Sequence, residues 1–495
     1  MDLTQFRQFA EQGYNRIPVW RSVLADLDTP LSVYLKLADG KNNFLLESVE
    51  GGEMWGRYSI IGLPCSRRFE YKHGRWRVYE LDELICDDET NDPLTMVEMV
   101  MHQINAAPVA ELPRLNGGLV GYFGYETMAT IEPCLEHMLQ LPDTLGVPDI
   151  CLLCADELAV FDNLQGRLYL IVNVEPQAED GSTAGEDYAQ AQRRLDQLQH
   201  RLRCGSPGYA QAARSYQLGE VSYGFAEADF KQAVARCQDY IAAGDCMQVV
   251  LSQRMSMPVG MPALDIYRAL RALNPSPYMY HMDFGDFQVI GSSPEVLVRV
   301  HDQRAMLRPL AGTRPRGQDS AEDQRLADEL LADDKERAEH LMLIDLGRND
   351  LGRVAVTGSV NVTEQMAVEL YSHVMHIVSA VECELDESHS TLDALRACFP
   401  AGTLSGAPKL RAMEIIAELE PMQRNIYAGT VGWLNWHGDA DLAIAIRTGV
   451  LQDHTLHLQA GAGIVADSDA QLEWQETMNK GRAMISAITQ AAQGL

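Results

Sequence analysis

The sequence predicts a mixed α+β protein in which layers of helices cover β-sheets. Candidate strands and helices alternate along its 495 residues without the strict strand–helix–strand period of a parallel sheet. Hydrophobic residues make up 46% and charged residues 22%, which is typical of a globular chain with a large core. No internal repeat of fixed period is found, and no apolar run reaches the ~18 residues of a membrane span.

In the first half, polar and glycine-containing segments separate the candidate elements. Helices are expected at 1–20, 95–104 and 187–202. Residues 31–79 are strand-like, with strands at 44–48, 55–63 and 75–79, and further strands are expected at 117–126, 150–161 and 167–174. Glycine, proline and serine between residues 205 and 222 indicate a linker. We therefore expect two parts, an N-terminal part over 1–220 and a C-terminal part over 221–495.

The second half continues with alternating elements. Helices are expected at 226–243, 264–273, 320–345, 390–398, 409–419 and 470–492. Strands are expected at 248–254, 279–284, 287–290, 296–300, 429–435 and 442–452, and residues 366–384 are also rich in strand-forming residues.

The chain is strongly acidic, with 70 acidic and 40 basic residues and a formal charge of −30. A field of this sign repels phosphate backbones and anionic lipids, which argues against nucleic-acid and membrane roles. The ten cysteines show no metal-binding spacing, and the close pair Cys151 and Cys154 lies in a strand-like run that predicts buried thiols. The N-terminus is polar and lacks a signal peptide, so we expect a cytoplasmic protein.

Two predicted helices each carry a pair of glutamates three residues apart. Glu336 and Glu339 share one helix face, and Glu473 and Glu476 share another, with Lys480 one turn later. Four carboxylates on two helices would suit Mg²⁺, which prefers oxygen ligands. The same spacing also fits solvated helix faces, which are the more common outcome of such a pattern.

Three loops have the composition of anion-binding segments. Residues 308–317 hold Arg308, Arg314 and Arg316 among prolines and glycines, 400–409 open a helix, and 461–466 have the pattern G-x-G-x-x-A. The first two also fit an exposed turn and ordinary helix capping. Too little chain follows residue 466 for a dinucleotide-binding unit, although its glycines would let the backbone approach an anion closely.

Several long stretches occur together and in one order. They are LLES (45–48), GGLVGYFGYE (117–126), QVVLSQ (248–253), NPSPYM (274–279), GSSPE (291–295), RPLAGTRPRG (308–317), ERAEHLMLIDLGRND (336–350), PAGTLSGAPK (400–409), IRTG (446–449) and QAGAGIVADSD (459–469). This set resembles the chorismate-utilising enzymes, and within them the component I family of anthranilate synthases. The resemblance covers nearly the whole chain.

The resemblance implies both a fold and a reaction. The fold would be two interlocked parts with orthogonally packed, mainly antiparallel β-sheets and helices outside. The reaction would be Mg²⁺-dependent: ammonia adds to ring carbon 2 of chorismate, the hydroxyl at carbon 4 leaves, and pyruvate is eliminated to give anthranilate.

The resemblance also assigns site residues. Catalytic roles fall to Glu295, the general acid, and to His376 and Thr403; substrate binding falls to Gly312, Thr313, Tyr427, Arg447, Gly461, Ala462 and Gly463. Metal ligation falls to Glu339 and Glu476, with Glu336 and Glu473 nearby, and a tryptophan feedback site to Ser48, Pro277, Tyr278 and Met279. The loop arginines 308, 314 and 316, together with Arg447, would offset the acidic charge around a dicarboxylate substrate.

Two positions discriminate within the family by their chemistry. Where aminodeoxychorismate synthases carry a lysine that attacks the ring, this chain has Ala311. Where isochorismate and salicylate synthases carry a lysine that activates water, it has Gln248. With neither lysine present, free ammonia is the expected nucleophile.

Ammonia requires a source, and the sequence has no glutaminase signature. The resemblance therefore implies a separate glutamine amidotransferase subunit (component II) in a hetero-oligomer such as a heterotetramer. Two alternatives remain: a synthase that stops at 2-amino-2-deoxyisochorismate for a secondary pathway, and a catalytically dead tryptophan-binding regulator.

Overall fold

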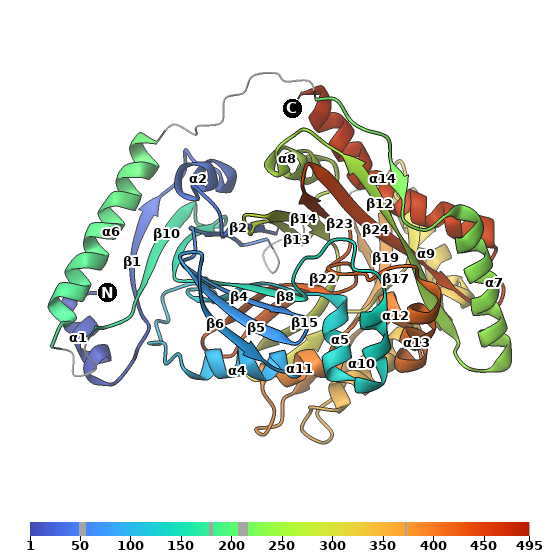
Figure 1. Ribbon diagram of the computed structural model, residues 1–495, viewed down its shortest axis with the longest axis horizontal. Coiled ribbons are helices and arrows are strands. Elements are labelled where there is room, and N and C mark those ends of the chain that lie inside the picture. The colour runs from blue at the N-terminus through green and yellow to red at the C-terminus, as the bar shows by residue number, and fades with distance from the viewer. Residues whose placement is uncertain (49–55, 178–181, 206–215, 372–373, 495) are drawn as a thin grey trace.

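The computed structural model describes residues 1–48, 56–177, 182–205, 216–371 and 374–494, and it consists of two large antiparallel sheets with helices outside them (Figure 1). The first sheet has the order β1 (Ile17–Leu24), β10 (Arg167–Val174), β9 (Glu157–Asp162), β3 (Tyr58–Gly62), β2 (Asn43–Glu47), β13 (Tyr278–Asp283), β14 (Phe287–Ser293), β23 (Thr448–Gln452), β24 (Thr455–Ile464), β12 (Gln248–Pro258) and β11 (Ser222–Tyr223), and β20 (Gly406–Ala407) pairs with β12. The second sheet has the order β17 (Leu310–Pro315), β19 (Val374–Glu384), β16 (Arg304–Leu307), β15 (Val296–His301), β22 (Ala440–Ile444), β21 (Thr430–Asn435), β7 (Gly118–Phe123), β8 (Ile150–Ala155), β4 (Arg67–Lys72), β5 (Arg75–Glu80) and β6 (Glu83–Glu89), and β18 (Asn361–Leu370) pairs with β19.

Both sheets contain strands from before and after residue 220. In the first sheet β2 pairs with β13, so that Leu46 lies opposite Tyr280. In the second sheet β7 pairs with β21, so that Gly121 lies opposite Gly432. The expected interlocked parts and antiparallel pairing are therefore confirmed. The boundary at residue 220 stays a prediction, because residues 206–215 of its linker lie outside the described residues.

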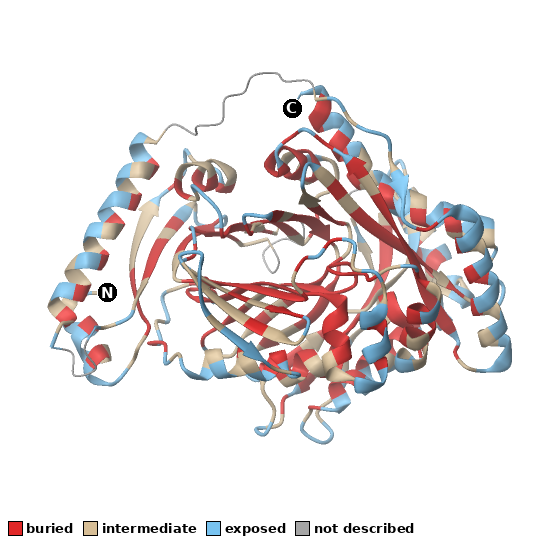
Figure 2. Ribbon diagram, in the orientation of Figure 1, coloured by how far each residue is buried: buried red, intermediate tan, exposed pale blue. Residues whose placement is uncertain are grey.

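The core lies between the two sheets and beneath the helices that cover their outer faces. In β8, Cys151 and Leu153 belong to the apolar cluster between the sheets, whereas Leu152 and Cys154 belong to the cluster beneath the helices. Successive side chains of a strand point to opposite faces, so both faces of β8 are buried. This confirms the expected core position of the two cysteines, and Figure 2 shows the same burial across the central strands.

Helices pack on the outer faces of both sheets. Against the first sheet lie α1 (Leu3–Glu11), α2 (Pro30–Leu37), α6 (Ala184–Cys204), α8 (Ala263–Leu273) and α14 (Ala470–Gln493), with α7 (Glu227–Ala243) and α13 (Lys409–Leu419) on β12. Against the second lie α4 (Pro93–His102), α9 (Ser320–Ala332), α10 (Asp334–Gly352), α11 (Thr391–Cys398) and the short α12 (Gly402–Ser405). No helix in the described part of the chain is long and apolar enough to cross a membrane.

Two expectations for the N-terminal region are wrong. The first helix ends at Glu11, and residues 17–20 already belong to β1. The strand-like segment after residue 31 begins with helix α2. Its apolar residues alternate as in a strand, but Thr29 and Ser32 form a capping box and Pro30 occupies the first turn, which favours a helix.

Three long predicted elements are each divided in two. The strand expected at 150–161 is β8 and β9, which lie in different sheets on either side of Asp156. The strand expected at 442–452 is likewise divided into β22 and β23, in different sheets. The helix expected at 320–345 ends at Ala332, because Asp333 caps the start of α10 by accepting hydrogen bonds from the amides of Lys335 and Glu336.

Candidate active site

A large cavity lies where the chain passes from one sheet to the other. Glu295 follows β14 of the first sheet and precedes β15 of the second, and Arg447 lies between β22 of the second sheet and β23 of the first. The two passages are hydrogen-bonded side by side, with the Ser292 amide donating to the Arg447 carbonyl (3.1 Å) and the Ile444 amide to the Glu295 carbonyl (3.0 Å). Two segments far apart in sequence are thereby fixed against each other.

The cavity has a volume of about 690 Å³ and brings together almost every predicted active-site residue. Its wall includes Glu295, Gly312, Thr313, Glu336, Glu339, His376, Thr403, Tyr427, Arg447, Gly461, Gly463, Glu473 and Glu476. Ala462 is the exception, because its side chain belongs to the apolar cluster that β12 and β24 form with α7 and α13. Ala462 is fully buried and does not line the cavity, although its two neighbours Gly461 and Gly463 do.

Glu295 is a buried carboxyl group that stays protonated at neutral pH. Burial raises its pKa to about 8, against the smaller opposing effects of a hydrogen bond from Thr403 and the positive charges of Arg447 and Lys480. The Thr403 hydroxyl donates to Oε1 over 3.2 Å from the start of α12. A neutral carboxyl group at the cavity wall can donate a proton to a leaving oxygen.

His376 on β19 is held by the neighbouring strand β17. Its Nδ1 lies 2.9 Å from the Gly312 carbonyl and 3.0 Å from the Thr313 hydroxyl. Donation from Nδ1 to the carbonyl leaves Nε2 as an unprotonated acceptor, and burial lowers the pKa of the ring, which favours this neutral form. His376 can therefore accept a proton from a bound molecule.

The two predicted metal ligands, Glu339 and Glu476, and the nearby Glu336 and Glu473 come from two helices that face the same cavity. Burial and the charge of Glu336 raise the pKa of Glu339 on α10, with a further contribution from Glu476 on α14. Burial and the charge of Glu476 also raise the pKa of Glu473. Because these carboxylates repel one another, a divalent cation between the helices would relieve the repulsion, and the donor set fits Mg²⁺.

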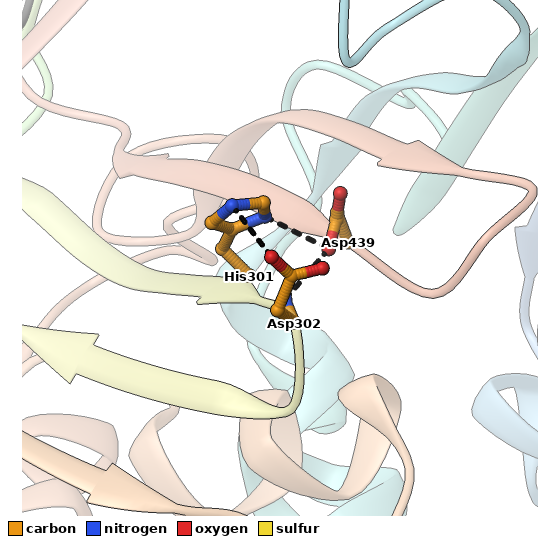
Figure 3. Close-up of side chains that lie close together, drawn as sticks. All are labelled: His301, Asp302 and Asp439. Atoms are coloured by element: carbon orange, nitrogen blue, oxygen red, sulfur yellow. Dashed lines mark hydrogen bonds and ion pairs between the residues drawn. The ribbon is translucent and has the colours of Figure 1, made fainter. Parts of the chain in front are cut away.

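A cluster of three potential metal ligands lies outside this cavity. His301, Asp302 and Asp439 have ligand atoms within 4.8 Å of one another (Figure 3). None of the three lines the cavity, and Asp439 Oδ1 already accepts a hydrogen bond from the amide of Asp302 and lies 3.3 Å from His301 Nδ1. These contacts tie the β15–β16 turn to the β21–β22 turn.

The expected role of the loop arginines is wrong. Arg308 pairs with Glu364 and Glu369, Arg314 with Glu329, Asp333 and Glu336, and Arg316 with Asp323. None of these three arginines lines the cavity. The arginine and lysine side chains that do line it are Arg447, Lys335 and Lys480. The expected loop is in fact largely strand β17, and its positive charge is neutralised by acidic neighbours that only the fold brings close.

The glycines at 461 and 463 leave space that side chains would fill. A Cβ atom on Gly461 would lie 2.8 Å from the hydroxyl of Tyr427, and one on Gly463 would lie 2.6 Å from Nε2 of Gln248. The two glycines therefore allow the backbone of β24 to lie close to Tyr427 and Gln248 at the cavity.

The structure adds Lys480 to the site. Its Nζ donates to the Gly461 carbonyl (2.9 Å) and pairs with Glu476 (2.7 Å), so it bridges α14 and the glycine strand. The sequence signal was its place one turn after Glu476, which by itself indicates only a surface ion pair. The two discriminating positions, Gln248 and Ala311, also line the cavity.

A second cavity of about 410 Å³ contains the four residues predicted to bind tryptophan. Ser48 at the end of β2 and Pro277, Tyr278 and Met279 at the start of β13 all line it. Tyr278 donates from its hydroxyl to Asp441 (2.8 Å), which also accepts from Arg299 (2.8 Å). The cavity thus has a largely apolar wall with a few polar groups, and it is separate from the one that holds Glu295.

The two cavities meet at one buried hydrogen bond. Tyr280 on β13 lines the second cavity and Thr448 on β23 lines the first, and their hydroxyl oxygens are 2.5 Å apart. Thr448 directly follows Arg447, so this hydrogen bond connects the wall of the second cavity to the segment that carries Arg447.

Comparison with known proteins agrees with the geometry. A family model described as chorismate binding enzyme matches residues 44–486. Anthranilate synthase component 1 of Pseudomonas putida is 53% identical and aligns with 100% of this chain and 99% of its own length, and that of Aquifex aeolicus is 46% identical over 99% and 97%.

Solved structures show the same fold. Anthranilate synthase component I from Streptococcus pneumoniae has a TM-score of 0.76 and 38% identity over 93% of this chain and 98% of its own. The menaquinone-specific isochorismate synthase from Escherichia coli has a TM-score of 0.70 at 21% identity over 98% of both chains, which indicates a shared fold. By its sequence, its fold and the residues gathered in its cavity, this chain belongs to the family of chorismate binding enzymes.

Proposed function

We propose that the chain converts chorismate and ammonia to anthranilate and pyruvate. The observation that carries the proposal is one cavity that combines a protonated acid, Glu295, with four carboxylates on α10 and α14. Relatives about half identical over their full lengths are named anthranilate synthase component 1, which supports the same reaction.

Glu295 and His376 supply the proton transfers. As ammonia bonds to ring carbon 2 and the ring double bonds shift, the hydroxyl at carbon 4 takes the Glu295 proton and leaves as water. In the second step His376 Nε2 takes the proton from carbon 2 and the bond between carbon 3 and the ether oxygen breaks. The enolpyruvate that leaves becomes pyruvate when its methylene carbon takes up a proton. Thr403 orients the acid, since its hydroxyl donates to Glu295 Oε1.

The cavity offers no lysine at the two positions where relatives use one. Ala311 carries no nucleophile, and the neutral amide of Gln248 cannot deprotonate water. Ammonia as the attacking group follows from these two residues. The chorismate carboxylates would be received by Arg447 and by the backbone of the glycine strand.

Glu339 and Glu476 would hold Mg²⁺, with Glu336 and Glu473 beside them. When bound, the ion would neutralise the ring carboxylate and act as a Lewis acid. Lys480 keeps Glu476 in place through their ion pair while it holds the Gly461 carbonyl.

The same proposal includes a partner and a feedback site. A glutamine amidotransferase subunit would deliver ammonia in a hetero-oligomer, and tryptophan would bind in the 410 Å³ cavity and act through Tyr280 and Thr448. We place the protein in the cytoplasm, because all ten cysteines are free thiols, as a reducing compartment would keep them.

The test is an incubation of the purified chain with chorismate, MgCl₂ and an ammonium salt. We expect fluorescent anthranilate to appear, and its formation to stop when the magnesium is chelated. Chorismate consumption without fluorescence would instead indicate the alternative, a synthase that stops at 2-amino-2-deoxyisochorismate. No consumption of chorismate would contradict both.

A further inference from the structure

Behind the wall of the active-site cavity, Arg424 and Glu420 form an ion pair that is almost completely shielded from solvent. Their side chains are 1% and 2% exposed. Arg424 donates to both carboxylate oxygens, over 2.9 Å from Nε and 2.6 Å from Nη2. Neither side chain lines the cavity. A buried ion pair often stabilises a fold no better than apolar packing does, so its role is best judged from what else it contacts.

Arg424 is bonded to two separate segments of the cavity wall. Its Nη1 donates to the carbonyl of Leu404 (2.8 Å) and its Nη2 to the carbonyl of Val250 (2.7 Å). Both acceptor residues line the cavity. Leu404 directly follows Thr403, whose hydroxyl donates to Glu295, so this bond fixes α12 at the acid.

The guanidinium also supports an aromatic wall residue. It lies 5.6 Å from the ring centre of Tyr427 and 4.7 Å from that of Tyr125. Cation–π attraction and close packing hold the Tyr427 ring against the ion pair. A Cβ atom on Gly461 would lie 2.8 Å from the Tyr427 hydroxyl, so the ring lies between Arg424 and the glycine strand.

Glu420 in turn is hydrogen-bonded to strand β12. Its Oε1 accepts hydrogen bonds from the amide and the hydroxyl of Ser252, both over 2.8 Å. The Ser252 oxygen in turn accepts from Nε2 of Gln459 (2.8 Å), and Gln459 lines the cavity. The chain of bonds thus runs from one wall to another through the ion pair.

We propose that Arg424 and Glu420 are positioning residues that hold four parts of the chorismate-binding wall (Val250, Leu404, Tyr427 and Gln459) in one fixed arrangement. The inference rests on the proposed function, since it takes chorismate as the ligand. Five donors in a rigid plane make these contacts possible for arginine, whereas lysine would keep the charge and lose most of them.

The test compares two lysine substitutions by titration calorimetry of chorismate, without ammonium, and of tryptophan. Arg424→Lys should raise the chorismate Kd about ten-fold, because a wall displaced by a fraction of an ångström weakens binding and orientation. The tryptophan Kd should stay within about two-fold of the parent value, because the second cavity lies outside this network. Arg16→Lys is the matched control: Arg16 is also a buried, ion-paired arginine, with a side chain 5% exposed, but it touches neither cavity.

An unchanged chorismate Kd in folded Arg424→Lys would overturn the inference, and so would an equal rise in Arg16→Lys, which would indicate general loosening. Should circular dichroism show Arg424→Lys to be unfolded, Glu420→Gln, of the same volume, is judged by the same criteria. Parent protein that binds chorismate and makes no anthranilate when ammonium is added would refute the proposed function, while the Kd comparison would still decide the inference.

Discussion

Replacing Glu295 by glutamine should stabilise the protein while removing its activity. The buried carboxyl group has a pKa of about 8, whereas an exposed glutamate in the unfolded chain has one near 4.5. At pH 7 the unfolded chain must therefore take up a proton when it folds, which costs about 3 kcal/mol of stability. Glutamine is neutral at every pH and avoids this cost. Without the acid, turnover should fall by roughly 10²- to 10⁴-fold.

The raised pKa of Glu295 determines how the free energy of unfolding should depend on pH. A group with a raised folded-state pKa contributes its full stability below the unfolded pKa and loses it as pH rises through the folded pKa. Urea unfolding should therefore show Glu295→Gln gaining on the parent between about pH 4.5 and pH 8, with little difference at pH 4. The exposed Glu11→Gln is the control and should show no such trend. A stability difference that does not change with pH would show that Glu295 is not protonated on folding, and turnover that survives in Glu295→Gln would show that it is not the acid.

Four further predictions follow from single contacts. Thr403→Val removes a bond that lowers the pKa of Glu295, so the alkaline fall of kcat, expected near pH 8, should move to higher pH in a pH–rate profile; a move to lower pH would contradict this. Glu339→Gln should abolish magnesium-dependent turnover and leave tryptophan binding by calorimetry intact; normal activity at ordinary magnesium concentrations would exclude Glu339 as a ligand. The methyl group of Gly461→Ala would collide with the hydroxyl of Tyr427 and should raise the chorismate KM about ten-fold. Gly352→Ala is the control, because its methyl group would meet no atom within 4 Å and should leave KM unchanged. Equal KM values for the two variants would contradict the predicted collision. Tyr280→Phe should still bind tryptophan but be inhibited less, because the bond to Thr448 is lost; full inhibition would show that the signal takes another path.

The sequence predicted the site better than it predicted the fold's connections. Long motifs such as GSSPE lie at strand ends and helix starts, where backbone geometry fixes side chains, so their residues meet in one cavity as expected. Local pattern could not show that the run 150–161 changes sheets at Asp156, because both strands are apolar and buried on both faces. Only the pairing partners, far away in sequence, determine where such a strand belongs.

Electrostatic roles were the least predictable from local sequence. Arg314 looked available for a substrate, yet it pairs with Asp333 and Glu336 from the next helices. Conversely, Lys480 looked like one half of a surface pair, and the fold carries it to the Gly461 carbonyl. Which charges meet depends on tertiary packing, and the same holds for the buried pair of Arg424 and Glu420, neither of which belongs to any of the motifs.

The proposed reaction can be checked by incubating the purified chain with chorismate, magnesium and isotopically labelled ammonium. We expect labelled anthranilate and pyruvate in equal amounts, with no reaction when magnesium is chelated. Isochorismate, or any product without the labelled nitrogen, would contradict the proposed reaction, because a cavity with Gln248 and Ala311 in place of lysines should use ammonia alone.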